Sequence, residues 1–364
     1  MQSLNHIQPL RKIIHIDMDC FFAAVEMRNN PAWQGVALAV GGESNRRGVI
    51  ATCNYEARKY GVRSAMSTAH ALRLCPHLIV TGGNMAHYKE VSQEIHKIFE
   101  RYTDIIQPLS LDEAWLDVSN CPSHHGSATL IAKNIRHDIK NELGLTASAG
   151  IAPNKFLAKI ASEENKPDGQ FAIPPQSIDN FLKDLALSRI NGIGKKTSSK
   201  LKQSGLFTCS DILQWDYFDL IKQFGNTGEY LWQRAHGIDN SPVQTVWQRK
   251  SLSIEHTWPQ DITELTDATS ALGELYLKLK QRIANNAPDR VIAKQCMKLK
   301  FDDFVSTSIE RKSPNGLCLH HLDQLFEVGW NRRNNRGIRL IGIGVIFSDN
   351  NISTQQQLSL FQNN

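Results

Sequence analysis

Acidic residues interrupt two apolar runs that otherwise have the composition of buried strands. Asp17 lies in Ile13-Ile14-His15-Ile16-Asp17-Met18, and Asp112-Glu113 come directly before Ala114-Trp115-Leu116. Burying an unpaired carboxylate costs several kcal/mol unless positive charge compensates it. Either these acids sit at strand ends, where they pair with Arg or Lys or cap neighbouring helices, or they surround a cation.

The rest of the composition indicates which cation would suit these acids. The seven cysteines are scattered and never spaced as Cys-x-x-Cys, and His124-His125 and His320-His321 have no partners at metal-ligand spacing. Carboxylate oxygens without a cysteine or histidine set suit Mg²⁺ or Mn²⁺ better than zinc. Two such ions, roughly 3.5–4 Å apart, are the usual apparatus for transferring a phosphoryl or nucleotidyl group.

Length and composition indicate several domains in a reducing cytoplasm. A chain of 364 residues exceeds what one core usually organises, and odd, scattered cysteines argue against a disulfide framework. Residues 1–10 lack the apolar core of a signal peptide, and no uncharged apolar stretch reaches the roughly 18 residues of a membrane span. The net charge of +5 permits an anionic partner without requiring one.

The order of elements between residues 11 and 164 predicts a ferredoxin-like βαββαβ unit. We expect strands over 11–19, 105–111, 114–118 and 146–151, and helices over 88–102, 128–143 and 154–164. In that topology the first strand lies beside the central hairpin. Asp17 would therefore meet Asp112-Glu113, and the acids would form one site.

Two further regions follow this unit. Short helices are expected at 178–185, 197–204, 210–214 and 217–224, and residues 237–249 have the composition of a linker. Beyond the linker, a separate α+β domain is expected, with strands at 251–257, 295–301, 306–311 and 338–347 and helices at 266–285 and 319–330.

Six sequence blocks, in this order along the chain, resemble the Y-family DNA polymerases and most closely their bacterial members. They are Asp17–Phe22, Thr52–Gly61, Ser110–Ala114, Gly150–Lys155, Asn165–Gly169 and Gly192–Gly194. The resemblance covers residues 11–347 and the pentapeptide 357–361. It implies a multidomain α+β right-hand polymerase with a ferredoxin-like palm, small fingers, a helical helix-hairpin-helix thumb and an α+β little finger.

The resemblance also implies boundaries for these parts. They are an N-terminal extension (1–10), palm (11–19 and 83–174), fingers (20–82), thumb (175–239), linker (240–250), little finger (251–348) and a flexible tail (349–364).

The activity that the resemblance implies is error-prone translesion synthesis by a DNA-directed DNA polymerase without a proofreading exonuclease. Two Mg²⁺ ions, which Mn²⁺ can replace, would activate the primer 3′-hydroxyl and neutralise the triphosphate. Family ligand positions, three of them catalytic acids, fall on Asp17, Asp112, Glu113 and the Met18 carbonyl. Asp19 and Asp117 are not family ligands, and structural roles are expected for them.

Nucleotide contacts are implied for a second set of residues. Tyr55 and Arg58 are one helical turn apart and can reach the same phosphates, although a packed tyrosine beside an exposed arginine is the simpler explanation. The resemblance makes them triphosphate contacts, together with Lys166, Lys159 and Thr52. Arginine suits this role because its fork binds two phosphate oxygens while staying charged.

Two further positions would shape the nucleotide pocket. By resemblance, Phe22 is the steric gate that collides with a ribose 2′-hydroxyl, whereas Phe21 belongs to the core. Ala51 matches a family position over the nascent base pair, where a small side chain leaves room for a damaged template base. Packing of a buried strand would select a small residue equally well.

Contacts with DNA are expected from both later domains. Gly192 and Gly194 let the backbone approach a phosphate closely, and Lys195 and Lys196 follow them; a plain helix-linking turn is the alternative. In the little finger, the resemblance implies DNA contacts for Arg249, Lys250, Arg332 and Arg333.

The partners implied are primer-template DNA, dNTPs and the bacterial sliding clamp. The clamp would bind the tail pentapeptide Gln357, Leu358, Ser359, Leu360 and Phe361. The expected protein is a cytoplasmic monomer that associates with the nucleoid when engaged and has no membrane partner.

Two other functions are compatible with parts of the chain. A non-catalytic DNA-binding or clamp-associated protein would need only the Gly192–Gly194 loop and the tail, but leaves the acids and phosphate contacts unexplained. A nucleotidyl cyclase can use a similar palm, but predicts no helix-hairpin-helix, little finger or clamp tail.

Overall fold

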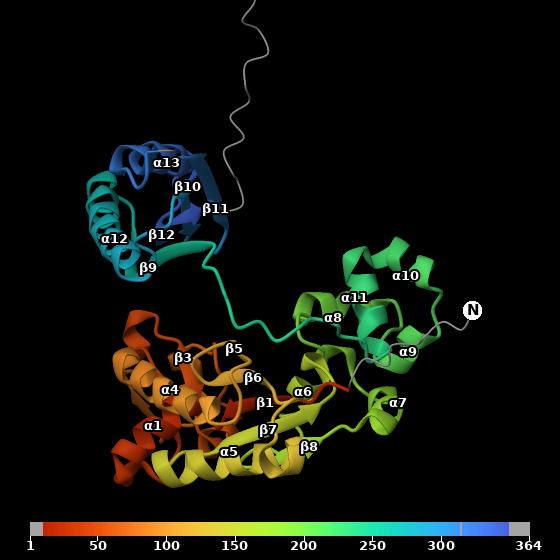
Figure 1. The fold of residues 1–364 in the computed structure, drawn as a ribbon. Coiled ribbons are helices and arrows are strands. Elements are labelled where there is room, and N and C mark those ends of the chain that lie inside the picture. Colours follow the sequence, from red (N-terminus) through yellow and green to blue (C-terminus); the bar gives the residue numbers. More distant parts are fainter. Residues whose placement is uncertain (1–9, 314, 349–364) are drawn as a thin grey trace, which may run out of the picture. The chain divides into compact units, whose positions relative to one another are not determined.

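The computed structural model describes residues 10–313 and 315–348, and the chain divides into two compact units (Figure 1). The first contains the described residues up to Gly42 and Val49–Val246, and the second contains Glu43–Gly48 and the described residues from Trp247 onward. In the described part of the chain, no helix combines the length and apolarity needed to cross a membrane.

The first unit is built on a five-stranded sheet with the strand order β5-β6-β1-β7-β8. The central strand β1 pairs antiparallel with both β6 and β7, which is the arrangement of a ferredoxin-like βαββαβ unit. The predicted topology is therefore confirmed. The strand bounds are β1 Ile13–Met18, β5 Ile106–Pro108, β6 Glu113–Asp117, β7 Ala147–Ala152 and β8 Gln170–Ala172.

Helices cover both faces of this sheet. On one face, α4 (Met85–Glu100) and α5 (Ala128–Leu143) bury their apolar stripes in a core with Ile14 and Ile16. On the other face, the short helix α6 (Lys155–Ala161) packs on β7. Gly150 of β7 allows this close approach, because a Cβ there would lie 1.9 Å from the Ala158 carbonyl oxygen.

A smaller sheet with the order β3-β2-β4 follows the first strand in sequence. It has its own core, formed around Ala39, Ile50 and Ala57. The buried Asn54 side chain caps the next helix by accepting from the Ala57 N–H at 3.0 Å, and it also donates to the Val36 carbonyl. The elements are α1 Phe21–Asn29, β2 Leu38–Gly41, β3 Ile50–Cys53, α2 Tyr55–Lys59, α3 Thr68–Leu74 and β4 Ile79–Thr81.

Short helices complete the first unit: α7 Ile178–Lys183, α8 Lys195–Gln203, α9 Cys209–Leu213, α10 Tyr217–Phe224 and α11 Asn226–Ala235. The last of these was missing from the sequence prediction. Glycines obscured it, because Gly225 separates it from α10 with a positive φ of 58° and Gly228 lies within its first turn.

The second unit is a four-stranded antiparallel sheet, ordered β11-β10-β12-β9, with two helices packed on one face. The predicted strands and helices are present, although β9 continues five residues beyond its predicted end. The elements are β9 Ser251–Ile262, α12 Leu265–Asn286, β10 Ile292–Phe301, β11 Ser306–Lys312, α13 Leu319–Asn331 and β12 Ile338–Phe347.

Candidate active site

Strand pairing brings the three acids together. Asp17 is the direct partner of Glu113 in the β1–β6 register, and the Met18 N–H donates to the Asp112 carbonyl at 2.9 Å. Both Asp17 and Glu113 are mostly buried. The predicted meeting of the first strand with the central hairpin is confirmed.

Two lysines lie against these acids. Lys166 Nζ is 2.8 Å from Asp17 Oδ1, and Lys159 on α6 donates to Glu113 Oε2. Burial raises the pKa of Asp17 to about 6, and the nearby Lys166 offsets this only in part. For Glu113 burial also raises the pKa, but contacts with His15 and Lys159 outweigh it and bring the pKa to about 2.

His15 is a member of the site that the sequence prediction missed. Its ring is fully buried, with Nδ1 2.8 Å from Ser162 Oγ and Nε2 3.3 Å from Glu113 Oε2, where Nε2 makes no well-aligned hydrogen bond. Burial lowers the pKa of this histidine to about 4, so the ring is neutral at pH 7. Strand alternation could have indicated it, since residues two apart face the same side.

The acids fit a divalent cation. Ligand-capable atoms of His15, Asp17 and Glu113 all lie within 4.8 Å of one another. The raised pKa of Asp17 means that this carboxylate still lacks full compensation of its charge. Carboxylate and carbonyl oxygens from Asp17, Asp112, Glu113 and Met18 form the donor set preferred by Mg²⁺ and Mn²⁺.

A cavity of about 270 Å³ opens beside the acids. Its lining unites nine residues predicted for the site, and adds Cys20, Phe21 and Ser64. Glu113 and Lys159 are not among the lining residues. The nine are Asp17, Met18, Phe22, Ala51, Thr52, Tyr55, Arg58, Asp112 and Lys166.

Two of these lining residues, Tyr55 and Arg58, lie in the helix α2. Asn54 caps the helix, so Tyr55 and Arg58 project from its first turns into the cavity. The Arg58 guanidinium carbon lies 4.7 Å from the centre of the Tyr55 ring, and Arg58 Nε donates to the Cys53 carbonyl at 3.2 Å. The pair is therefore held as a unit with two polar groups facing the same space.

Phe22 and Ala51 both line the cavity. Phe22 stacks on Tyr88 with ring centres 4.4 Å apart and planes 13° apart, whereas Phe21 is 2% exposed and belongs to the core. Ala51 is exposed, so the alternative that core packing selected its small side chain does not apply.

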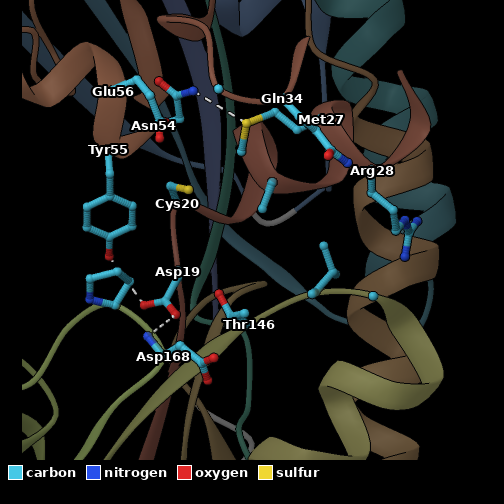
Figure 2. Close-up of a pocket in the computed structure, with 15 residues that line it drawn as sticks. Asp19, Cys20, Met27, Arg28, Gln34, Asn54, Tyr55, Glu56, Thr146 and Asp168 are labelled. Atoms are coloured by element: carbon cyan, nitrogen blue, oxygen red, sulfur yellow. Dashed lines mark hydrogen bonds between the residues drawn. The ribbon is translucent and has the colours of Figure 1, made fainter. Parts of the chain in front are cut away.

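Asp19 and Asp117 have contacts of their own. Asp19 is buried and accepts from Ser148 Oγ. It also accepts from Tyr55 Oη and the Asp168 N–H (Figure 2). Asp117 accepts from the N–H and hydroxyl of Ser119. Figure 2 also shows a second cavity, of about 370 Å³, beside Asp19.

The predicted DNA-contacting loop lies at the start of α8. Gly192 is left-handed (φ 87°) and Gly194 is the N-cap residue; an added Cβ at either glycine would meet open space. Lys195 and Lys196 follow and are exposed. The backbone here is accessible to a large anionic partner.

In the second unit, each of the predicted cations has contacts or exposure of its own. Arg332 at the end of α13 donates to Thr307 Oγ1 at 3.0 Å, and Arg333 stacks 4.0 Å from the Trp330 ring centre. Arg249 lies over Trp247, and Lys250 is exposed. The predicted clamp-binding residues 357–361 lie outside the described residues.

Comparisons with known proteins agree along the chain. Residues 16–163 match the impB/mucB/samB family and residues 249–360 match the C-terminal domain of that family. Residues 188–239 match a domain described as the DNA polymerase-iota thumb. These matches include regions that the cyclase alternative lacks.

Similar proteins cover nearly the whole chain. DNA polymerase IV of Vibrio parahaemolyticus serotype O3:K6 is 52% identical over 97% of this chain and 99% of its own length. DNA polymerase IV of Yersinia enterocolitica serotype O:8 is also 52% identical, over 96% of this chain and 99% of its own.

Solved structures show the same fold. The Y-family DNA polymerase chimera Dbh-Dpo4(243-245)-Dbh superposes with a TM-score of 0.82 at 29% identity, covering 92% of this chain and 98% of its own. An insertion ternary complex of Dbh DNA polymerase gives a TM-score of 0.65 at 28% identity over the same shares of the two chains.

Proposed function

The chain belongs to the Y-family DNA polymerases, which perform error-prone translesion synthesis, and we propose that Asp17, Asp112 and Glu113 hold its catalytic divalent ions. The family copies DNA by two-metal-ion nucleotidyl transfer and has no proofreading exonuclease. The β1–β6 register, which pairs Asp17 with Glu113 beside Asp112, is the observation that carries the proposal. The proposed ions are Mg²⁺, with Mn²⁺ as a substitute, and the Met18 carbonyl is a further ligand.

Each residue of the site then has a defined task. The ions, when bound, supply Lewis-acid activation of the primer 3′-hydroxyl and charge neutralisation at the triphosphate. Asp17 and Glu113 would hold the ions, and Lys166 and Lys159, which pair with these acids in the structure, would bind phosphate oxygens of the triphosphate. Tyr55, Arg58 and Thr52 line the cavity that receives the triphosphate, and Ala51 leaves space over the base pair.

Primer extension tests this assignment directly. The purified chain, supplied with Mg²⁺ and dNTPs, should extend a primer on an intact template and on one carrying a damaged base. Failure to extend either template, with a folded protein and DNA binding intact, would contradict the proposed site.

Phe22 is the proposed selector of the sugar. The Phe22→Ala variant should lose about 10–100-fold of its discrimination against ribonucleotides, because relief of a steric clash is worth about 1–3 kcal/mol and each 1.36 kcal/mol is a factor of ten. The measurement is the ratio of kcat/KM for a dNTP to that for the matching ribonucleotide. An unchanged ratio, in a variant that still uses dNTPs, would show that another residue is the gate.

The remaining parts keep the assignments expected from the sequence. The palm (11–19 and 83–174) and fingers (20–82) form the site, while the thumb (175–239) and little finger (251–348) hold primer-template DNA. Proposed backbone contacts are Gly192, Gly194, Lys195, Lys196, Arg249, Lys250, Arg332 and Arg333. The exposed glycine backbone at the start of α8 supports the thumb contacts.

The proposed clamp partner has a separate test. Deleting residues 357–361 should abolish stimulation of synthesis by the bacterial sliding clamp and leave synthesis without the clamp unchanged, because a short tail orders only on its partner. Primer extension with and without clamp measures both. Loss of basal synthesis would contradict a tail that acts only on the clamp. We further propose a monomer in the bacterial cytoplasm, at the nucleoid when engaged.

A further inference from the structure

Asp19 is a buried carboxylate held by neutral donors. It is 2% exposed, and no lysine or arginine of the described residues forms an ion pair with it. Its oxygens accept from Ser148 Oγ at 2.8 Å, from the Asp168 N–H at 2.8 Å and from Tyr55 Oη at 3.3 Å. A buried carboxylate needs such donors, because each hydrogen bond that is missing leaves part of the charge without a partner to replace water.

These three donors come from separate parts of the first unit. Ser148 lies in the central sheet on β7, Tyr55 begins α2, and Asp168 follows Lys166 by two residues. Figure 2 shows Asp19 between Tyr55 and Asp168. One carboxylate therefore connects the sheet to two elements that each carry a proposed triphosphate contact.

Tyr55 packs against the core that contains Ile14 and Ile16, and both Tyr55 and the loop also border a cavity. The second cavity, of about 370 Å³, is lined by Tyr55, Pro167 and Asp168 as well as by Asp19. Empty space cannot fix a tyrosine ring or a loop, whereas hydrogen bonds can. The loop is braced elsewhere by Arg136, whose guanidinium pairs with the Asp168 carboxylate at 2.8 Å.

We propose that Asp19 is a positioning residue that sets Tyr55 and the Lys166 loop for the incoming triphosphate. The inference rests on the proposed function of the first cavity. A tyrosine hydroxyl has one hydrogen, and its 3.3 Å bond to Asp19 is long. Asp19 can therefore orient the Tyr55 hydroxyl in the nucleotide-free protein, and in the nucleotide complex the hydroxyl can donate its one hydrogen to a phosphate oxygen instead.

The test separates nucleotide binding from turnover. In Asp19→Asn the side chain keeps its shape, but one oxygen becomes an NH₂ group that faces a donor. KM for dNTP should rise about 10-fold, with kcat changed less than about threefold, as expected when one or two hydrogen bonds are lost. Asp117→Asn is the control, since that acid is also held by hydroxyl and N–H donors, and its KM should not change.

A double-mutant cycle identifies the route of the effect. Asp19→Asn should raise KM less in the Tyr55→Phe background than in the intact protein, because part of its action passes through the tyrosine hydroxyl. If Asp19→Asn folds poorly, Ser148→Ala removes one support of Asp19 and should give a smaller rise in KM at unchanged kcat.

The outcomes are distinguishable. If the intact chain extends primers, a normal KM for dNTP in both Asp19→Asn and Ser148→Ala would overturn the positioning role. Equal losses of kcat and burst amplitude with an unchanged KM would also overturn it. An intact chain that extends no primer would instead overturn the proposed function.

Discussion

Replacing Asp112 by asparagine should lower the rate of nucleotide incorporation at least about 10³-fold and leave the fold intact. A bound metal supplies several kcal/mol of transition-state stabilisation, and each 1.36 kcal/mol is a factor of ten. Asp112 lines the cavity beside Asp17, and its side chain is fixed by the Ser110 hydroxyl at 2.5 Å. An amide can keep that contact but is a much poorer metal ligand than a carboxylate.

Single-turnover incorporation at saturating dNTP and Mg²⁺ measures this loss. Asp117→Asn is the matched control, because Asp117 lies at the other end of β6 and bonds only to Ser119 among its side-chain contacts in the described residues. Its rate should stay within about twofold of the intact protein. Near-normal incorporation by Asp112→Asn would remove this acid from the metal site.

Gly150→Ala should destabilise the first unit by about 3 kcal/mol or more. The new Cβ would lie 1.9 Å from the Ala158 carbonyl oxygen and 2.3 Å from the Ser162 nitrogen. Both atoms are backbone at α6, so no side chain can turn aside, and overpacking of this kind is among the costliest substitutions. Because α6 carries Lys159, its displacement should also reduce synthesis.

Urea unfolding measures the stability change. Gly273→Ala is the control: its Cβ would meet nothing within 4 Å inside α12, so the better helix propensity of alanine should add up to about 1 kcal/mol. Equal stabilities for Gly150→Ala and the intact protein would mean that α6 does not pack on β7 as described.

Local signals made much of this fold predictable. The predicted limits of α5 agree with the structure because Ser127 caps its start, through a bond to the Leu130 N–H, and Gly144 ends it in a left-handed conformation. By contrast, α6 ends at Ala161 rather than at the predicted Glu164. The loop that follows contains Asp168, whose φ is positive (49°). Periodicity carries no information about such a conformation.

Some residues of the site could be predicted from the sequence and others could not. Asp17 and Asp112-Glu113 were predictable, since carboxylates in apolar strands need an explanation and the βαββαβ order brings them together. The contacts of Asp19 were not, because its third donor is the backbone N–H of Asp168, a non-glycine residue at φ 49°. Sequence spacing does not reveal where a backbone N–H in a tight turn will point.

The metal site is tested most directly by a crystal structure of the chain with primer-template DNA, a non-hydrolysable dNTP and Mn²⁺, in which anomalous scattering locates the metal. Two manganese peaks are expected among the oxygens of Asp17, Asp112 and Glu113, with the triphosphate against Tyr55 and Arg58. Manganese held by other residues, with Asp17 still paired to Lys166 and Glu113 still paired to Lys159, would contradict this metal site.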